Sequence, residues 1–133
     1  TNVADYDKMS ISMKFRNAAG RGIFGELKVK GKLPMTGKYM AYVGSYSYTG
    51  KAKGITVYDV DVEAGKFIYR CEVEVDNSSY LKASQNGQIL YSIADEGVVA
   101  FRVLSNGSLA RLNSANIRGM RGCHLSTSKA DEL

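Results

Sequence analysis

The chain has 133 residues, enough for one ordinary domain with its own core, and its 44% hydrophobic share excludes a disordered chain. No apolar run reaches the length of a membrane span, and residues 1–30 lack the apolar core of a signal peptide. The net charge of +5 is uneven, because residues 1–53 carry 10 Lys and Arg against 3 Asp and Glu, whereas residues 54–133 carry 8 against 10. Alternate lysines on a strand usually form its solvated face, so we expect no nucleic-acid partner and no membrane partner.

Residues 9–16 are the first segment with a regular pattern, because apolar and polar side chains alternate there as in a half-buried strand. A glycine-rich turn and a second strand over residues 23–30 follow, which together predict a β-hairpin. The only proline, Pro34, lies in a connector after this strand. We therefore expect residues 1–38 to form an N-terminal extension, distinct from residues 39–133.

From residue 39 onward, short segments rich in Val, Ile, Tyr, Phe and Thr follow one another, and none has sustained helical periodicity. The turns between them place Gly65, Gly87 and Gly107 where a positive φ is needed. The fold class is therefore all-β. The predicted strands are 39–47, 54–61, 66–75, 79–84, 89–95, 97–104, 108–114 and 122–128.

Two stretches of the chain repeat at a fixed spacing. Residues 79–84 line up with residues 123–128 at an offset of 44, and residues 54–58 line up with residues 97–101 at an offset of 43. A period in the forties with several short strands per repeat is typical of a β-propeller, in which each repeat forms one four-stranded blade. We therefore predict about two four-stranded antiparallel units, too few to close a ring.

The strands can be labelled a to d from the centre of the propeller outward. In these terms the chain reads b-c-d, a-b-c-d and a final a. We therefore expect the first blade to lack its innermost strand and the last to be incomplete, so that the chain is an N-terminal fragment of a propeller.

Cys71 and Cys123 are far apart and lack the C-x-x-C or His-rich spacing of a zinc site. A disulfide framework is not expected with only two cysteines. The pattern predicts reduced thiols in a cytoplasmic protein, with neither metal nor cofactor.

Five short motifs follow one another along the second part of the chain. They are residues 42–47 (YVGSYS), 54–59 (GITVYD), 77–81 (NSSYL), 84–91 (SQNGQILY) and 122–126 (GCHLS). In this order they resemble the opening of the 6-phosphogluconolactonase-type lactonases, which are seven-bladed β-propellers.

The resemblance runs from about Tyr39 to Ser128 and implies metal-independent hydrolysis of a sugar lactone such as 6-phosphogluconolactone. Relatives of the fold also include muconate-lactonising enzymes, so the fold alone does not fix the reaction. The chain departs from the family pattern at Arg121-Gly122, where Gly-Pro often precedes the Cys-His pair.

Strand order predicts where polar residues gather. Successive strands of a blade run in opposite directions. The residues at which each strand a begins and the connections from strand b to strand c therefore lie at the same mouth of the ring, where propellers usually bind ligands. Tyr80 and His124 lie at starts of a strands, whereas Tyr46 and Glu96 lie in b-to-c connections. These side chains are therefore expected at one mouth.

His124 is the only histidine, and the matching family position is a site residue in relatives. Histidine can act as a general base or donate a hydrogen bond to a developing oxyanion, so we predict that role for His124. Glu96 is a second candidate acid or base. For both residues an ordinary structural role stays open. For Glu96 in particular, an acidic residue in a turn next to glycine is usually only solvated.

Arg118 and Arg121 precede His124 in the same connection and are candidates for holding a phosphate or carboxylate. Tyr46 and Tyr80 are candidate substrate contacts, although packing between blades would also explain both. For Arg118 and Arg121, the alternative to anion binding is that both are ordinary solvated residues of a loop.

The predicted function is hydrolysis of a small-molecule sugar lactone, and a fragment without its other blades is expected to be inactive. The alternative is a non-catalytic β-propeller-type binding module, or one that self-associates through exposed blade edges.

Overall fold

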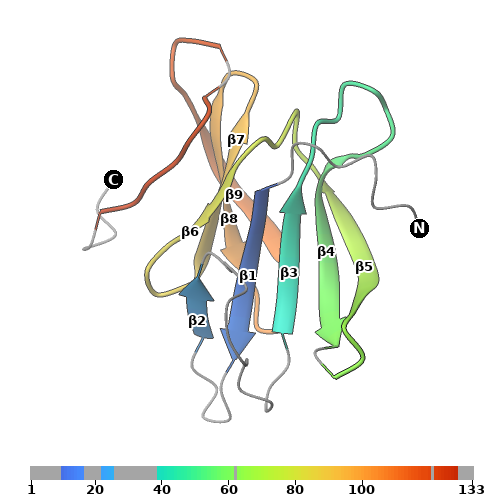
Figure 1. The fold of residues 1–133 in the computed structure, drawn as a ribbon. Coiled ribbons are helices and arrows are strands. Elements are labelled where there is room, and N and C mark those ends of the chain that lie inside the picture. Colours follow the sequence, from blue (N-terminus) through green and yellow to red (C-terminus); the bar gives the residue numbers. More distant parts are fainter. Residues whose placement is uncertain (1–9, 17–21, 26–38, 62, 121, 129–133) are drawn as a thin grey trace.

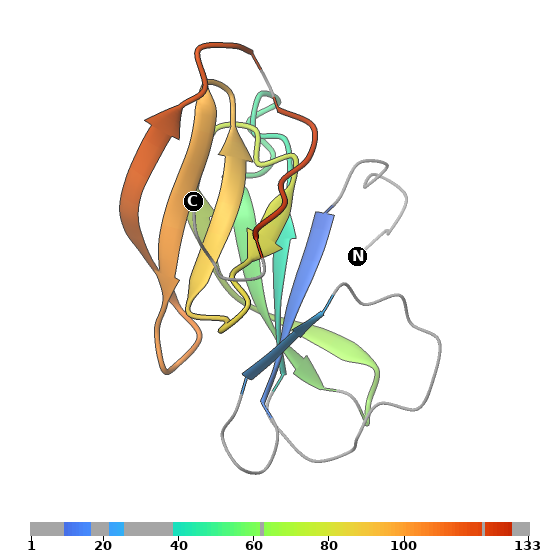
Figure 2. The same ribbon diagram turned by 90° about the vertical axis from the view of Figure 1, so that its left-hand side faces the viewer.

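The chain forms two antiparallel sheets that face each other (Figures 1 and 2). A computed structural model describes residues 10–16, 22–25, 39–61, 63–120 and 122–128. The first sheet has the order β2-β1-β3-β4-β5, and the second has the order β6-β7-β8-β9. The expected all-β class is confirmed. The strands are β1 (Ser10–Arg16), β2 (Gly22–Gly25), β3 (Tyr39–Gly44), β4 (Gly54–Asp61), β5 (Lys66–Glu74), β6 (Leu81–Ala83), β7 (Ile89–Ala94), β8 (Gly97–Val103) and β9 (Leu109–Asn116).

The second sheet is one complete blade, in which β6 to β9 follow each other as strands a to d. In the first sheet, β3, β4 and β5 are strands b, c and d, as the sequence predicted. The prediction of a last strand over residues 122–128 is wrong, because this segment is not a strand. A strand needs a hydrogen-bonded neighbouring strand, and none of the described strands pairs with this segment.

The N-terminal hairpin belongs to the first sheet. β1 pairs antiparallel with β2 on one side and with β3 on the other, with Ser10 opposite Gly44. The predicted hairpin is therefore present, although residues 26–30 lie outside the described residues. The expectation that the first blade lacks its innermost strand is wrong, because β1 occupies that position beside β3 and contacts β6 of the neighbouring sheet. The pattern of alternation in the hairpin could not reveal which strand it would join.

The predicted turn chemistry is confirmed at all three glycines. Gly65, Gly87 and Gly107 have φ values of 62°, 68° and 84°. In the last two turns the preceding asparagine also contributes, since the side chain of Asn106 accepts a hydrogen bond from the amide of Ser108 (2.9 Å). These turns hold neighbouring strands in register.

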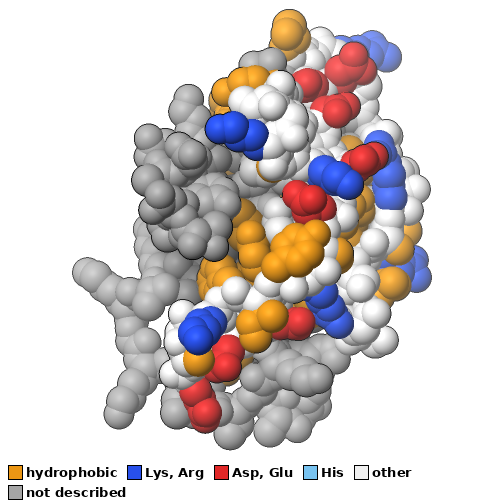
Figure 3. All heavy atoms as spheres, turned by 90° about the vertical axis from the view of Figure 1, so that its right-hand side faces the viewer, with side chains coloured by type: hydrophobic (Ala, Val, Ile, Leu, Met, Phe, Trp, Pro, Cys, Tyr) orange, Lys and Arg blue, Asp and Glu red, His pale blue; other side chains and the backbone are white. Residues whose placement is uncertain are grey.

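The edge strand β5 exposes large apolar side chains. Phe67, Ile68 and Tyr69 are 47%, 52% and 61% exposed, and Phe67 and Tyr69 share one face of the sheet because side chains alternate along a strand. Tyr58 of β4 packs against Phe67 and Tyr69 at ring distances of 5.7 and 6.4 Å. Figure 3, which views the molecule from the side of β5, shows hydrophobic side chains gathered near the middle of this face.

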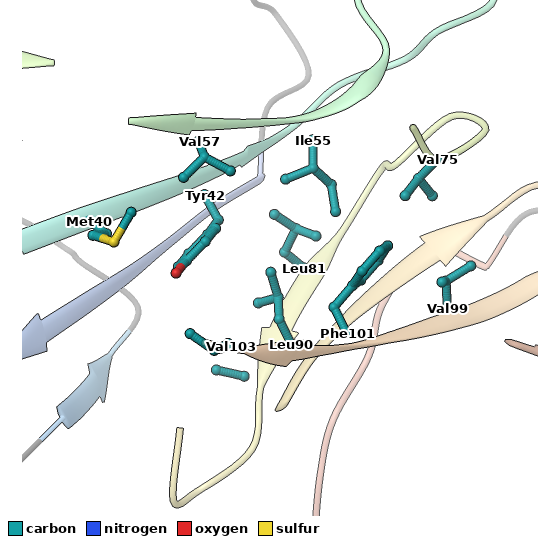
Figure 4. Packing of buried hydrophobic residues seen from close by; sticks show 11 residues of the cluster. Met40, Tyr42, Ile55, Val57, Val75, Leu81, Leu90, Val99, Phe101 and Val103 are labelled. Atoms are coloured by element: carbon teal, nitrogen blue, oxygen red, sulfur yellow. The ribbon is translucent and has the colours of Figure 1, made fainter. Parts of the chain in front are cut away.

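The core lies between the two sheets, where side chains of one blade pack on those of the next (Figure 4). Alternation in β4 and β8 directs every second side chain to this interface. Tyr42, Ile55, Leu90 and Phe101 are almost fully buried there. The whole cluster consists of Met40, Tyr42, Ile55, Val57, Val75, Leu81, Ala83, Leu90, Val99, Phe101 and Val103.

Polar contacts at one end of this core lock the sheets together. The buried Tyr42 hydroxyl donates to the carbonyl of Gly107, in the β8–β9 turn, at 2.6 Å. Arg70 of β5 reaches the same turn, where it donates to the carbonyl of Asn106, and it also pairs with Asp59 at 3.7 Å. The β8–β9 turn is therefore bound to the first sheet by two side chains.

We predict that Tyr42→Phe destabilises the protein by about 1–2 kcal/mol, because it leaves the buried Gly107 carbonyl without its donor. Urea denaturation of the two proteins measures the difference. Tyr69→Phe is the control and should have no measurable effect, since Tyr69 is 61% exposed. Equal stability of Tyr42→Phe and the unmodified protein would contradict this prediction.

Among the described residues, no helix has the length and apolar character needed to span a lipid bilayer.

Candidate functional site

The connections predicted to form one mouth do lie at one end of the two sheets. This end is uppermost in Figure 1 and carries the β3–β4 loop, the β7–β8 turn and the segment after β9. A hydrogen bond from the amide of Ile117 to the carbonyl of Glu96 (3.0 Å) joins the last two. The candidate residues in these connections fall into two groups.

The first group is built around Tyr80 and His124. Their rings lie 4.7 Å apart between centroids, with an angle of 50° between the ring planes. The two residues occupy equivalent positions of the repeat, 44 residues apart. Successive repeats lie side by side around a propeller axis, so the repeat itself brings this pair together. Tyr80 is half-buried, whereas His124 is exposed to solvent.

Residues next to this pair line a cavity of about 230 Å³. Tyr46 from the β3–β4 loop forms part of its wall, and Tyr48 packs edge-on against Tyr46 with ring centroids 5.8 Å apart. The hydroxyl of Ser79 donates to the carbonyl of Gly122 at 3.4 Å, which joins the residues that precede Tyr80 and His124. The full lining is Tyr46, Asn77, Ser79, Ile93, Ala94, Gly122 and Cys123.

The second group contains Glu96 and Arg118, and neither residue lines that cavity. Asn116 joins them, because its Nδ2 lies 3.5 Å from a Glu96 carboxylate oxygen and its Oδ1 accepts from the amide of Arg118 at 2.6 Å. Glu96 lines a neighbouring hollow of about 300 Å³, together with Asp76 and Arg111, and Ala94 lines both hollows. The structure therefore does not bring Glu96 into the cavity beside His124. Arg121 lies outside the described residues.

Sequence reasoning did not single out Asn77, whose side chain contacts two other connections at this end. Its side chain accepts from the amides of Ser47 (2.9 Å) and Tyr48 (3.1 Å) and donates to both carboxylate oxygens of Asp95 (2.9 and 3.0 Å). The only local signal was an asparagine in a connection, a residue type that tolerates a positive φ; its φ is 50°.

Cys71 is half-buried and Cys123 is exposed, and both carry thiols. Within the part of the chain that the structure describes, no three His, Cys, Asp or Glu side chains come together in a way that could hold a metal ion.

Comparison with known proteins identifies the family. A profile of the family described as "Lactonase, 7-bladed beta-propeller" matches residues 40–133. The chain belongs to this lactonase family. The matched residues include both candidate groups, and the family assignment confirms the resemblance seen in the motifs.

Two relatives show how much of a family member this chain represents. A 6-phosphogluconolactonase of Formosa agariphila is 32% identical over 100 residues, which cover 69% of this chain and 28% of that protein. A Bacteroides fragilis protein, provisionally assigned as a 6-phosphogluconolactonase, has a similar fold, with a TM-score of 0.58 and 23% identity. That match covers 95% of this chain and 29% of the other. This lactonase-family chain thus spans less than a third of either relative.

Proposed function

We propose that this chain forms part of the active-site mouth of a lactonase that hydrolyses a sugar lactone of the 6-phosphogluconolactone type. The observation that supports this most directly is the His124 ring, which packs against Tyr80 beside a cavity, in a chain of the lactonase family. The Formosa agariphila relative, named 6-phosphogluconolactonase, supports the substrate class.

Lactone hydrolysis adds water to the ring carbonyl, passes through a tetrahedral oxyanion, and breaks the ring C–O bond to leave a carboxylate and a hydroxyl group. His124 can take a proton from the attacking water or donate a hydrogen bond to the oxyanion. Tyr80 packs against the imidazole ring in a tilted arrangement and so restricts its position. Tyr46 then forms the wall against which the sugar ring lies.

An anionic substituent on the sugar needs a cationic partner. Arg118 and Arg121 fit this role because guanidinium groups bind phosphate in a bidentate manner, and both lie in the connection that leads to His124. Arg118 belongs to the second group with Glu96, so it would bind the anionic substituent at a distance from His124. Glu96 is assigned the weaker role of a second acid or base, since it lines the neighbouring hollow.

The proposal is tested by incubating the intact protein with 6-phosphogluconolactone and following the appearance of the carboxylate product. Turnover well above the spontaneous rate is expected. Residues 1–133 alone should give no turnover, since they span 28% of the relative and the remaining blades would complete the site. Absence of turnover by the intact protein would overturn the proposal.

We predict that chelators leave the activity unchanged, because water activation is assigned to His124 rather than to a metal ion. The measurement is the initial rate of lactone hydrolysis before and after prolonged dialysis against EDTA. A large loss of rate that Mg²⁺, Mn²⁺ or Zn²⁺ restores would contradict the assignment.

One observation favours a second candidate function, a non-catalytic module that binds a protein or a further copy of itself. Phe67 and Tyr69 of β5, together with Tyr58 of β4, form an exposed aromatic surface on one face of the first sheet. Such surfaces commonly take part in protein association. In this case the intact protein would associate without hydrolysing the lactone.

A further inference from the structure

Asn77 joins three connections at the mouth. It lies between β5 and β6, where it is only 6% exposed. Its Oδ1 accepts from the amides of Ser47 and Tyr48 in the β3–β4 loop, and its Nδ2 donates to Asp95 in the β7–β8 turn. Its own amide donates to the Ser47 hydroxyl at 3.0 Å. One side chain and its backbone amide therefore link the two blades at this end.

The β3–β4 loop needs such an anchor because of its length. It spans residues 45–53, whereas the equivalent β7–β8 turn consists of Asp95 and Glu96 alone. The base of the loop is closed by Ser45, whose amide donates to the carbonyl of Gly54 at 2.7 Å. Farther out, the contacts from Asn77 fix residues 47 and 48, next to the cavity-lining Tyr46.

The amide group of Asn77 has little capacity left for a ligand. An asparagine carbonyl oxygen has two lone pairs, and here two backbone amides occupy them. The NH₂ group faces both oxygens of Asp95. Asn77 lines the cavity, but its polar atoms serve the neighbouring loops.

We propose that Asn77 is a positioning residue for substrate binding: through Ser47 and Tyr48 it holds Tyr46 against the cavity beside His124. The inference rests on the proposed function, because it gives the β3–β4 loop a role in binding the sugar. The carboxylate of Asp95 accepts from the side-chain NH₂ group of Asn77. This orients the side chain so that its carbonyl oxygen faces the β3–β4 loop.

The test exchanges the two partners. Asn77→Asp places two carboxylates about 3 Å apart, where like charges repel, so the loop should lose its anchor. The double variant Asn77→Asp/Asp95→Asn restores a carboxylate beside an amide, and the carboxylate, now at position 77, can accept both from the loop amides and from the new amide at position 95. Asp95→Asn alone keeps an acceptor opposite Asn77 and is the matched control.

Two readouts are made on the intact protein. Hydrogen exchange at the amides of Ser47 and Tyr48 should accelerate by about tenfold or more in Asn77→Asp and return toward the original rate in the double variant. The KM for 6-phosphogluconolactone should rise several-fold in Asn77→Asp with a smaller change in kcat, as expected for lost substrate binding, and should recover with the exchange. The Asp95→Asn control should change both readouts less than Asn77→Asp.

The outcomes separate this inference from the proposed function. Unchanged exchange at Ser47 and Tyr48 in Asn77→Asp, or failure of the double variant to restore protection, would overturn the positioning role. An altered exchange rate with rescue, but with an unchanged KM, would overturn the link to substrate binding. If exchange behaves as expected in a protein that hydrolyses no lactone, the anchor is supported and the lactonase proposal alone fails.

Discussion

Replacing His124 with alanine is expected to lower kcat/KM for lactone hydrolysis by at least about 100-fold, the usual contribution of a positioned acid or base. The His124 side chain contacts the ring of Tyr80 but is exposed to solvent, so its removal should change the chemistry far more than the fold. The measurement is a steady-state assay on the intact variant, with urea denaturation as a check on stability.

A second substitution distinguishes the two possible roles of His124. Glutamine can donate a hydrogen bond but cannot take up a proton at neutral pH, so His124→Gln should keep part of the activity only if the ring stabilises the oxyanion. Ser126→Ala is the control, since Ser126 is exposed two residues farther on. Full activity of His124→Ala would overturn the assignment of His124 as the acid, base or oxyanion donor.

Gly54→Ala is expected to destabilise the protein by about 4 kcal/mol, the sum of backbone strain and overpacking. Gly54 has a φ of 122°, which residues with a side chain rarely adopt. A Cβ atom there would lie 2.2 Å from the carbonyl oxygen of Val75, and a backbone atom next to the sheet has little freedom to move. Urea denaturation of the variant measures the effect.

Gly65→Ala separates the two causes. Gly65 also has a positive φ, of 62°, but a Cβ atom there would meet nothing within 4 Å. This variant should therefore lose only about 1 kcal/mol, the cost of the backbone conformation. If the two substitutions cost the same, close approach to Val75 would not be the reason for glycine at position 54.

The strands and turns could be predicted from the sequence because their signals are local. The enrichment in Val, Ile, Tyr and Thr and the flanking turn signals predicted both bounds of β4 at residues 54 and 61, and Asn-Gly pairs predicted the turns at Gly87 and Gly107. The offset of 44 residues also predicted that Tyr80 and His124 lie in neighbouring units, and the rings are in contact. Each of these features depends on a pattern that extends over only a few residues or over one repeat, so the sequence alone is enough to predict it.

The remaining features depend on partners that are distant in sequence. The alternation in β1 indicated a strand but not its pairing with β3. The hydrogen bonds of Asn77 to the β3–β4 loop span about 30 residues and leave no periodic signal. Glu96 lies at the same end of the sheets as His124, as expected, but strand order could not show that its side chain lines another hollow, because that depends on side-chain contacts such as the one with Asn116.

The contact between Tyr80 and His124 also has an evolutionary consequence. When a blade is duplicated, the new blade lies next to the old one. Equivalent residues at the mouth of the two blades therefore become neighbours in space, as Tyr80 and His124 are. A change in the size or polarity of one ring therefore alters the surroundings of the other. Among relatives, we expect positions 80 and 124 to vary together, whereas each can vary independently of the core between the sheets.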